Sequence, residues 1–197
     1  MRIAVIAVQG SVEEHLESVS KAMGNLGLDG EVIPVRRHGI VSRCDGVIIP
    51  GGESTTISRL IFKDSIAEEI VDIARKGKPV MGTCAGLILL AKHGDEQVKK
   101  TGTKLLNLMD IWVKRNAFGR QRESFQVKLK IDEIGEYEAV FIRAPVITKV
   151  GSGVRILAKF KDYIVAAREK NLLAFAFHPE LTEDTRVHEY FLKLAAR

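Results

Sequence analysis

The stretch that most constrains the fold is residues 78–91, Lys-Pro-Val-Met-Gly-Thr-Cys-Ala-Gly-Leu-Ile-Leu-Leu-Ala. A short apolar strand here runs into Gly-x-Cys-x-Gly and then into an apolar helix, which is typical of a nucleophile elbow. The reactive side chain would be Cys84, because a helix start favours a thiolate and the backbone N–H of Ala85 could bind an oxyanion. A buried structural cysteine in a Gly-bounded turn explains the same residues, and the elbow alone does not decide between the two.

Composition narrows the class of protein. The chain has 197 residues, 46% of them hydrophobic, which predicts one domain spanning 1–197 with a substantial core. The net charge of +5 comes from 30 basic residues interleaved with 25 acidic ones, so we expect solvated helix faces and no nucleic-acid partner. The apolar run at 3–8 is followed at once by Gln9-Gly10, and no stretch reaches transmembrane length. We therefore expect no signal peptide, no membrane association and a cytoplasmic location. Cys44 and Cys84 offer neither a disulfide framework nor metal-ligand spacing, so no metal site is expected.

The first half of the chain alternates apolar strands with amphipathic helices. Strands are predicted at 3–8, 31–35 and 46–49, and helices at 56–62 and 65–76. Ser11, with Glu14 three residues later, is predicted to cap the helix that follows the first strand. This order indicates an α/β fold with a mainly parallel sheet.

The second half has a different pattern. Residues 111–114, 125–131 and 154–160 alternate polar and apolar side chains, which predicts antiparallel strands with one wet face. Residues 172–177 return to a buried strand, and 183–196 close the chain as a helix. We therefore expect a three-layer α/β fold, with a mainly parallel open sheet flanked by helices and an added antiparallel portion.

A cysteine nucleophile needs a base, and His178 is the best candidate because it ends the buried run 172–177. Pro179 holds His178 out of the helical region, so His178 and Glu180 would point to the same side of an extended segment. Glu180 could then fix the imidazole tautomer, which gives Cys84, His178 and Glu180 the roles of nucleophile, base and orienting carboxylate. The other histidines, His15, His38, His93 and His188, are expected on the surface or in loops.

The loop at 50–56, Pro-Gly-Gly-Glu-Ser-Thr-Thr, follows the strand at 46–49. It lacks the Gly-Lys-Ser/Thr ending of a P-loop, so we do not expect a nucleotide. Gly51 and Gly52 suit close backbone approach to a small substrate and could supply a second oxyanion N–H. The alternative is a tight turn capped by Ser54.

Several motifs together resemble one family. Residues 82–87 and Phe177-His178-Pro179-Glu180 resemble a class I, triad-type glutamine amidotransferase, which is flavodoxin-like in fold. With the blocks at 50–56, 115–121, 141–145 and 181–184, essentially the whole chain resembles the glutaminase subunits of pyridoxal 5′-phosphate synthase. The cysteine and His-Pro-Glu motifs occur in many amidotransferases, whereas the blocks at 115–121 and 141–145 are more specific to this one family. Residues 94–103 are less family-like and are interpreted as a variable loop.

The resemblance implies an activity and a partner. Members hydrolyse L-glutamine to L-glutamate and pass ammonia to a (β/α)8-barrel synthase, which makes pyridoxal 5′-phosphate from ribose 5-phosphate and glyceraldehyde 3-phosphate; no cofactor is implied for this subunit. Backbone donors at Gly52 and Ala85 would hold the oxyanion. The residues expected to contact glutamine are Gly51, Gly52, Glu53, Ser54, Arg115, Ile142 and Arg143. For Arg115 a surface ion pair is the alternative.

Two other functions remain open on the sequence. A glutaminase subunit serving histidine or purine biosynthesis would share the triad but would carry different blocks at 115–121 and 141–145. A non-enzymatic binding or redox-sensing α/β domain could carry a reactive elbow cysteine, with His178 and Glu180 incidental. For the amidotransferase we also expect an isolated chain with low activity, because a flip of the Gly51-Gly52 peptide could turn an oxyanion donor away until the synthase docks.

Overall fold

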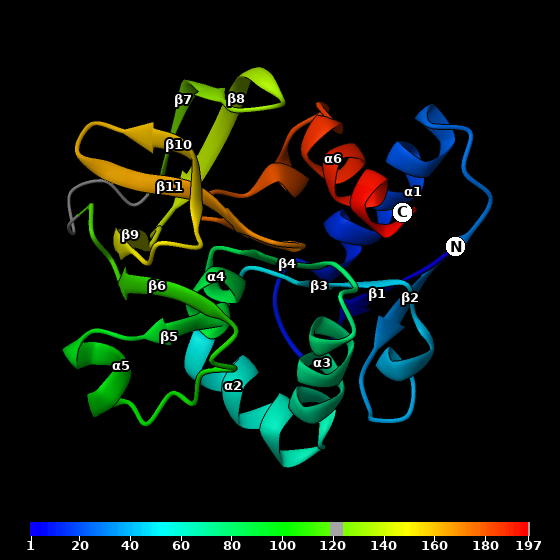
Figure 1. Cartoon of the computed structure of the whole chain (residues 1–197), viewed down its shortest axis with the longest axis horizontal. Helices are drawn as coiled ribbons and strands as arrows, with labels where there is room; N and C mark the ends of the chain where they lie inside the picture. Colours follow the sequence, from blue (N-terminus) through cyan, green and yellow to red (C-terminus); the bar gives the residue numbers. More distant parts are fainter. Residues whose placement is uncertain (119–123, 197) are drawn as a thin grey trace.

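The computed structural model describes residues 1–118 and 124–196, and its chain trace is shown in Figure 1. Most strands of the described residues join one large sheet. In spatial order these strands are β2 (Glu31–Val35), β1 (Arg2–Ile6), β3 (Gly46–Ile49), β4 (Val80–Thr83), β12 (Leu172–Phe175), β11 (Tyr163–Glu169), β9 (Val146–Val150), β6 (Met109–Lys114) and β5 (Ala91–His93), with β10 (Arg155–Phe160) paired to β11.

The half of this sheet from β2 to β12 is parallel throughout. Its order, β2-β1-β3-β4-β12, is the flavodoxin-like order, in which the carboxyl ends of the strands carry the functional residues. Beyond β12, the pairs β12–β11, β11–β9, β9–β6 and β11–β10 are antiparallel. The predicted α/β class, with a mainly parallel sheet and an antiparallel portion, is confirmed.

The antiparallel part is larger than the sequence patterns indicated. A separate hairpin joins β7 (Ser124–Ile131) to β8 (Gly135–Ile142), and β8, β9 and β11 were not predicted as strands. The predicted strand at 111–114 lies within β6, which pairs antiparallel with β9 but parallel with β5. Its assignment as simply antiparallel was therefore incomplete, because sheet partners are set by contacts that alternation does not specify.

Helices cover both faces of the parallel half of the sheet, as the three-layer prediction requires (Figure 1). On one face lie α1 (Val12–Asn25) and α6 (Arg186–Ala195), which contact each other. The other face carries α2 (Ser54–Lys63), α3 (Ile66–Arg75) and α4 (Ala85–Leu90). A short helix, α5 (Glu96–Lys100), occupies the segment expected to be a variable loop. No helix of the described residues is long and apolar enough to cross a membrane.

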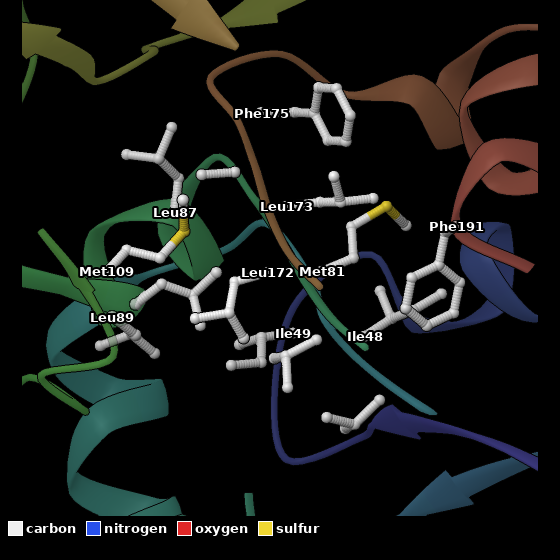
Figure 2. Packing of buried hydrophobic residues seen from close by; sticks show 14 of the residues in the cluster. Ile48, Ile49, Met81, Leu87, Leu89, Met109, Leu172, Leu173, Phe175 and Phe191 are labelled. Atoms are coloured by element: carbon white, nitrogen blue, oxygen red, sulfur yellow. The ribbon is translucent and has the colours of Figure 1, made fainter. Parts of the chain in front are cut away.

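The parallel strands are buried on both sides, which explains their continuous apolar runs. Figure 2 shows neighbouring side chains of β3 pointing to opposite faces: Ile48 lies toward Phe191 of α6, whereas Ile49 lies toward Leu89 of α4. The core therefore consists of two apolar layers separated by the sheet. The packing of these layers fixes where each strand ends relative to its neighbours.

The predicted Ser11 cap is wrong. Helix α1 begins at Val12 without a side-chain cap, and the Ser11 hydroxyl donates instead to Glu180 Oε1 at 2.6 Å. The final helix starts at Arg186, three residues later than predicted, and a separate 3-10 turn, η2 (Pro179–Leu181), precedes it. Ser11 is thus part of a long-range contact that local spacing could not reveal.

The sharp turn after β4 has the geometry of a nucleophile elbow. Cys84 has φ 48° and ψ −103°, a strained combination for a residue with a side chain, and α4 begins at the next residue. Gly86 makes this turn possible, because a Cβ at this position would lie 2.0 Å from the carbonyl oxygen of Ile49. The elbow is therefore pressed against the end of β3, beside the loop that starts at residue 50.

Gly86→Ala should destabilise the protein by about 1–3 kcal/mol, because the added methyl group forces β3 and α4 apart. Urea unfolding followed by circular dichroism measures the change. Gly24→Ala, in helix α1, is the matched control: its Cβ would meet nothing within 4 Å, and it should stabilise by about 0.4–1 kcal/mol. Equal stability of Gly86→Ala and the wild type would contradict the close contact.

Candidate active site

A cavity of about 420 Å³ lies at the carboxyl ends of β3, β4 and β12. It contains Cys84 and His178 together with most of the residues predicted to contact substrate. The lining residues are Gly52, Glu53, Ser54, Cys84, Ala85, Ile88, Arg115, Asn116, Ile142, Arg143, Pro145 and His178. Two of the predicted site residues, Gly51 and Glu180, do not line the cavity and lie behind the imidazole ring of His178.

Cys84 and His178 meet against the backbone of Gly51. A Cβ on Gly51 would lie 2.4 Å from His178 Cε1 and 3.3 Å from the Cβ of Cys84, so both side chains pack closely on this glycine. The Cys84 Sγ atom also lies 3.8 Å from the carbonyl oxygen of Ile142. His178 has φ −106° and ψ 87°, outside the helical region as Pro179 predicts, and its N–H donates to the Val140 carbonyl at 2.8 Å.

Glu180 reaches His178 by a different route from the predicted one. The segment after His178 is not extended, because Pro179–Leu181 forms the 3-10 turn η2. That turn carries the carboxylate back under the ring, and Glu180 Oε1 lies 2.7 Å from His178 Nδ1. The same oxygen accepts the Ser11 hydroxyl, and Glu180 is only 5% exposed. The predicted contact exists, although the extended geometry was wrong.

The electrostatics of this pair favour an ionised carboxylate. Burial raises the pKa of Glu180. The neighbouring His15 and His178 and the Ser11 hydroxyl lower this pKa by more than burial raises it, so it falls to about 2. Burial lowers the pKa of His178, but its hydrogen bonds to Cys84 and Glu180 outweigh this and raise it to about 10. Each shift stabilises the charged form of its group, as expected for a hydrogen-bonded imidazolium–carboxylate pair.

The prediction that His15 and His188 are surface or loop residues is wrong. Both are fully buried between α1 and α6, with ring nitrogens 3.1 Å apart. His15 Nε2 lies 3.3 Å from Glu180 Oε2 and 3.1 Å from the Thr83 hydroxyl. Neighbouring charges and helical context suggested exposure, and only the packing of α1 on α6 reveals that these histidines reach the site. His38, in contrast, is exposed as predicted.

The loop after β3 contributes Glu53 and Ser54 to the lining of the cavity. Glu53, not Ser54, caps α2, since its carboxylate accepts from the N–H groups of Thr55 at 3.0 Å and Thr56 at 2.6 Å. Burial raises the pKa of Glu53, but these hydrogen bonds hold it below its ordinary value. The alternative of a turn capped by Ser54 is therefore wrong. Within the described part of the chain, the buried Ser54 hydroxyl has no hydrogen-bond partner.

Arg115 is held from two sides at the edge of the cavity. Its guanidinium lies 3.6 Å from Glu53 Oε1 and donates to the Thr101 hydroxyl at 3.2 Å. Its backbone N–H donates to Asp95 at 2.8 Å. Segment 94–103 therefore positions a predicted substrate contact, which its unfamiliar sequence did not indicate.

Three cavity residues were absent from the predicted contacts: Ile88, Asn116 and Pro145. Asn116 and Pro145 lie inside the blocks at 115–121 and 141–145, so those blocks were the available signal; residues 119–121 lie outside the described part of the chain. Ile88 lies one turn after the elbow cysteine. No group of three or more His, Cys, Asp or Glu among the described residues could hold a metal ion.

Comparison with known proteins identifies the family. Residues 5–197 match the SNO glutamine amidotransferase family. The chain belongs to that family. It is therefore an enzyme of the glutamine amidotransferase class, and the resemblance found in its motifs is confirmed.

Relatives and solved structures agree with this family. The chain is 66% identical to pyridoxal 5′-phosphate synthase subunit PdxT of Archaeoglobus fulgidus over 98% of each chain, and 56% identical to the protein of that name from Methanocella arvoryzae over 98% of this chain and 97% of the relative. A crystal structure described as a glutamine amidotransferase superposes with a TM-score of 0.87 at 41% identity, covering 99% of both chains. PurLQS from Thermotoga maritima, at 14% identity and a TM-score of 0.67 over 98% and 97% of the two chains, shares the fold alone.

The two cysteines should differ in reactivity. Cys44 is fully buried, and burial raises the pKa of its thiol to about 11, whereas Cys84 lines the cavity. Near pH 8, iodoacetamide should alkylate Cys84 at least about 100-fold faster than Cys44. Peptide mass spectrometry of the native protein measures both rates, with the denatured chain as the control in which they converge. Faster labelling of Cys44 in the native protein would contradict this assignment.

Proposed function

We propose that this chain is the glutaminase subunit of a pyridoxal 5′-phosphate synthase and hydrolyses L-glutamine to L-glutamate and ammonia. The observation that carries the proposal is the contact of His178 with Cys84 on one side and with the buried Glu180 on the other, beside a cavity that holds the predicted substrate contacts. The names of the relatives from Archaeoglobus fulgidus and Methanocella arvoryzae support the assignment to this synthase.

The reaction proceeds in two acyl-transfer steps. The Cys84 thiolate attacks the side-chain amide carbon of glutamine, and His178 donates its proton to the leaving nitrogen, which departs as ammonia. His178, now neutral, takes a proton from water as that water attacks the thioester. Glutamate leaves, and the thiolate–imidazolium pair is restored. Glu180 keeps the Nδ1–H of His178 directed toward itself, so that Nε2 serves the reacting atoms in both steps.

The tetrahedral intermediates need donors for their oxyanion. The N–H of Ala85 is the first of α4 and has no acceptor within the helix, so it is available to the cavity. The second donor is the N–H at Gly52, in the loop that packs against His178. Removing one such donor typically lowers the rate about 100- to 1,000-fold.

The rest of the cavity suits the amino-acid end of glutamine. Arg115 and Arg143 bring two cations to its rim, and a guanidinium fork can bind the α-carboxylate bidentately. The Ser54 hydroxyl offers an unused hydrogen-bonding group, and Ile142 covers the aliphatic part of the substrate. The Glu53 side chain is occupied as a helix cap, so its contribution is to hold the loop and balance Arg115.

The partner that receives the ammonia is a (β/α)8-barrel synthase, which combines it with ribose 5-phosphate and glyceraldehyde 3-phosphate. Such a barrel would dock on the face formed by the carboxyl ends of the strands, where the Gln9-Gly10 turn lies beside the loop at 50–53. Gln9 already contacts this loop, because its side-chain carbonyl accepts the N–H of Glu53 at 2.9 Å. A partner that moves this turn would therefore also move the loop that carries the oxyanion donor.

Glutamate release from glutamine, measured with the synthase present, tests the activity. Cys84→Ala should lower turnover on the order of 10⁶-fold, and Glu180→Gln should lower it by roughly 10²- to 10⁴-fold, because it removes only the orienting charge. Cys44→Ala, remote from the cavity, is the control and should retain activity. Unchanged turnover in Cys84→Ala would refute the mechanism, and unchanged turnover in Glu180→Gln would reduce Glu180 to a structural residue.

Turnover by the isolated chain should be low and should rise strongly when the synthase is added, mainly through kcat. Gly52 has φ 153°, and a Cβ there would lie 2.5 Å from the Gln9 side-chain oxygen, so Gly52→Ala should hinder any rearrangement of this loop and weaken activation. Gly24→Ala is the matched control. Equal turnover with and without a bound synthase would refute the switch, and normal activation of Gly52→Ala would place it elsewhere.

A further inference from the structure

The proposed mechanism uses one histidine, yet two more lie buried behind the carboxylate. His15 comes from α1 and His188 from α6, and both are fully buried. His188 Nε2 lies 3.1 Å from His15 Nδ1, and His15 Nε2 faces Thr83 Oγ1 at 3.1 Å and Glu180 Oε2 at 3.3 Å. A continuous line of polar atoms therefore runs from α6 through α1 to the carboxylate beside His178.

The positions of the acceptors decide where the protons lie. A bare His15 Nε2 would place its lone pair 3.3 Å from a carboxylate oxygen, and the two would repel each other. That arrangement would also put a proton on His188 Nδ1, a buried atom with no hydrogen-bond partner among the described residues. With the proton on His15 Nε2, both problems disappear: His15 Nδ1 becomes an acceptor, and His188 Nε2 is its donor.

We propose that His15 is a positioning residue for the triad: a hydrogen bond that His15 Nδ1 accepts from His188 keeps the proton on Nε2, which donates to Thr83 and lies 3.3 Å from Glu180 Oε2. The inference rests on the proposed glutaminase function. Ser11 and His178 donate to Glu180 Oε1, and the His15 N–H brings a positive dipole end to Glu180 Oε2, 3.3 Å away, an oxygen without a hydrogen-bond partner among the described residues. Thr83 directly precedes Cys84, so the same N–H also steadies the residue before the nucleophile.

Neutral histidines are consistent with this arrangement. Burial lowers the pKa of His15, and burial lowers that of His188 to about 3, so both rings stay neutral at the pH of the reaction. The other titratable groups whose charges act on His15 and His188 are Glu180, His178 and Glu14. Loss of the His15 N–H removes the positive dipole end that lies 3.3 Å from Oε2 of this buried carboxylate, which raises the pKa of Glu180. Protonated Glu180 no longer accepts from His178 as a carboxylate, so activity at low pH falls first.

Two substitutions separate this role from simple packing. His15→Leu fills similar volume without a donor, whereas His15→Gln keeps a side-chain N–H. We expect His15→Leu to lower kcat roughly 10- to 100-fold with KM little changed, and to move the acid limb of the pH dependence of kcat/KM to higher pH. His15→Gln should recover much of the activity and restore the acid limb. His38→Leu, on an exposed loop, should behave as the wild type.

The assay is glutamine hydrolysis by the complex with synthase, followed across pH. An unchanged acid limb in a folded His15→Leu, or equal losses in His15→Leu and His15→Gln, would overturn the positioning role. If wild-type complex hydrolyses no glutamine, the proposed function fails instead, and the proton assignment is then judged by the next measurement.

Nitrogen-15 NMR of the histidine rings in the unmodified protein needs no activity and no variant that folds poorly. We expect His15 and His188 both as neutral Nε2–H tautomers, with bare Nδ1 atoms, while His178 carries a proton on Nδ1. An Nδ1–H tautomer of His15 would overturn the inference whatever the kinetics show.

Discussion

The arrangement around the site depends on one buried carboxylate, that of Glu180, which must be stabilised by its neighbours. Glu180 is charged and 5% exposed, and a buried charge is costly unless donors surround it. The donors come from segments far apart in the chain, Ser11 just before α1 and His178 at the end of the run that contains β12, and His15 of α1 lies 3.3 Å from the second oxygen. The packing of α1 and α6 on one face of the sheet therefore also sets the orientation of the imidazole beside Cys84.

A second condition is close approach of backbone to backbone at the strand ends. Gly86 lets α4 start against the last residue of β3, and Gly51 lets the following loop lie flat against His178. Side chains at either position would push Cys84, His178 and the first turn of α4 apart by more than a hydrogen bond tolerates. The two apolar layers of the core hold β3, β4 and β12 in register, so these short distances depend on packing well away from the cavity.

The sequence predicts what local pattern controls. Continuous apolar runs identify parallel strands because both faces are covered, and Gly-x-Cys-x-Gly with His178-Pro179-Glu180 identifies the residues that the structure brings together. It does not predict features that depend on distant partners. Ser11 has the spacing of a cap but bonds Glu180, and His15 has charged neighbours but faces His188, 173 residues away. The strands β9 and β11 likewise become recognisable only beside their partners in the sheet.

The short helix α5 and its flanks add a different kind of consequence. Asp95 and Thr101 hold Arg115 from outside the cavity, and the Thr101, Thr103 and Thr55 hydroxyls connect this segment to the first turn of α2. Neither Asp95 nor any of these three threonines is among the residues that line the cavity. For protein engineering, the molecule therefore contains two separately adjustable parts: the cavity at the carboxyl ends of the strands, and a peripheral segment whose length and composition set the position of Arg115.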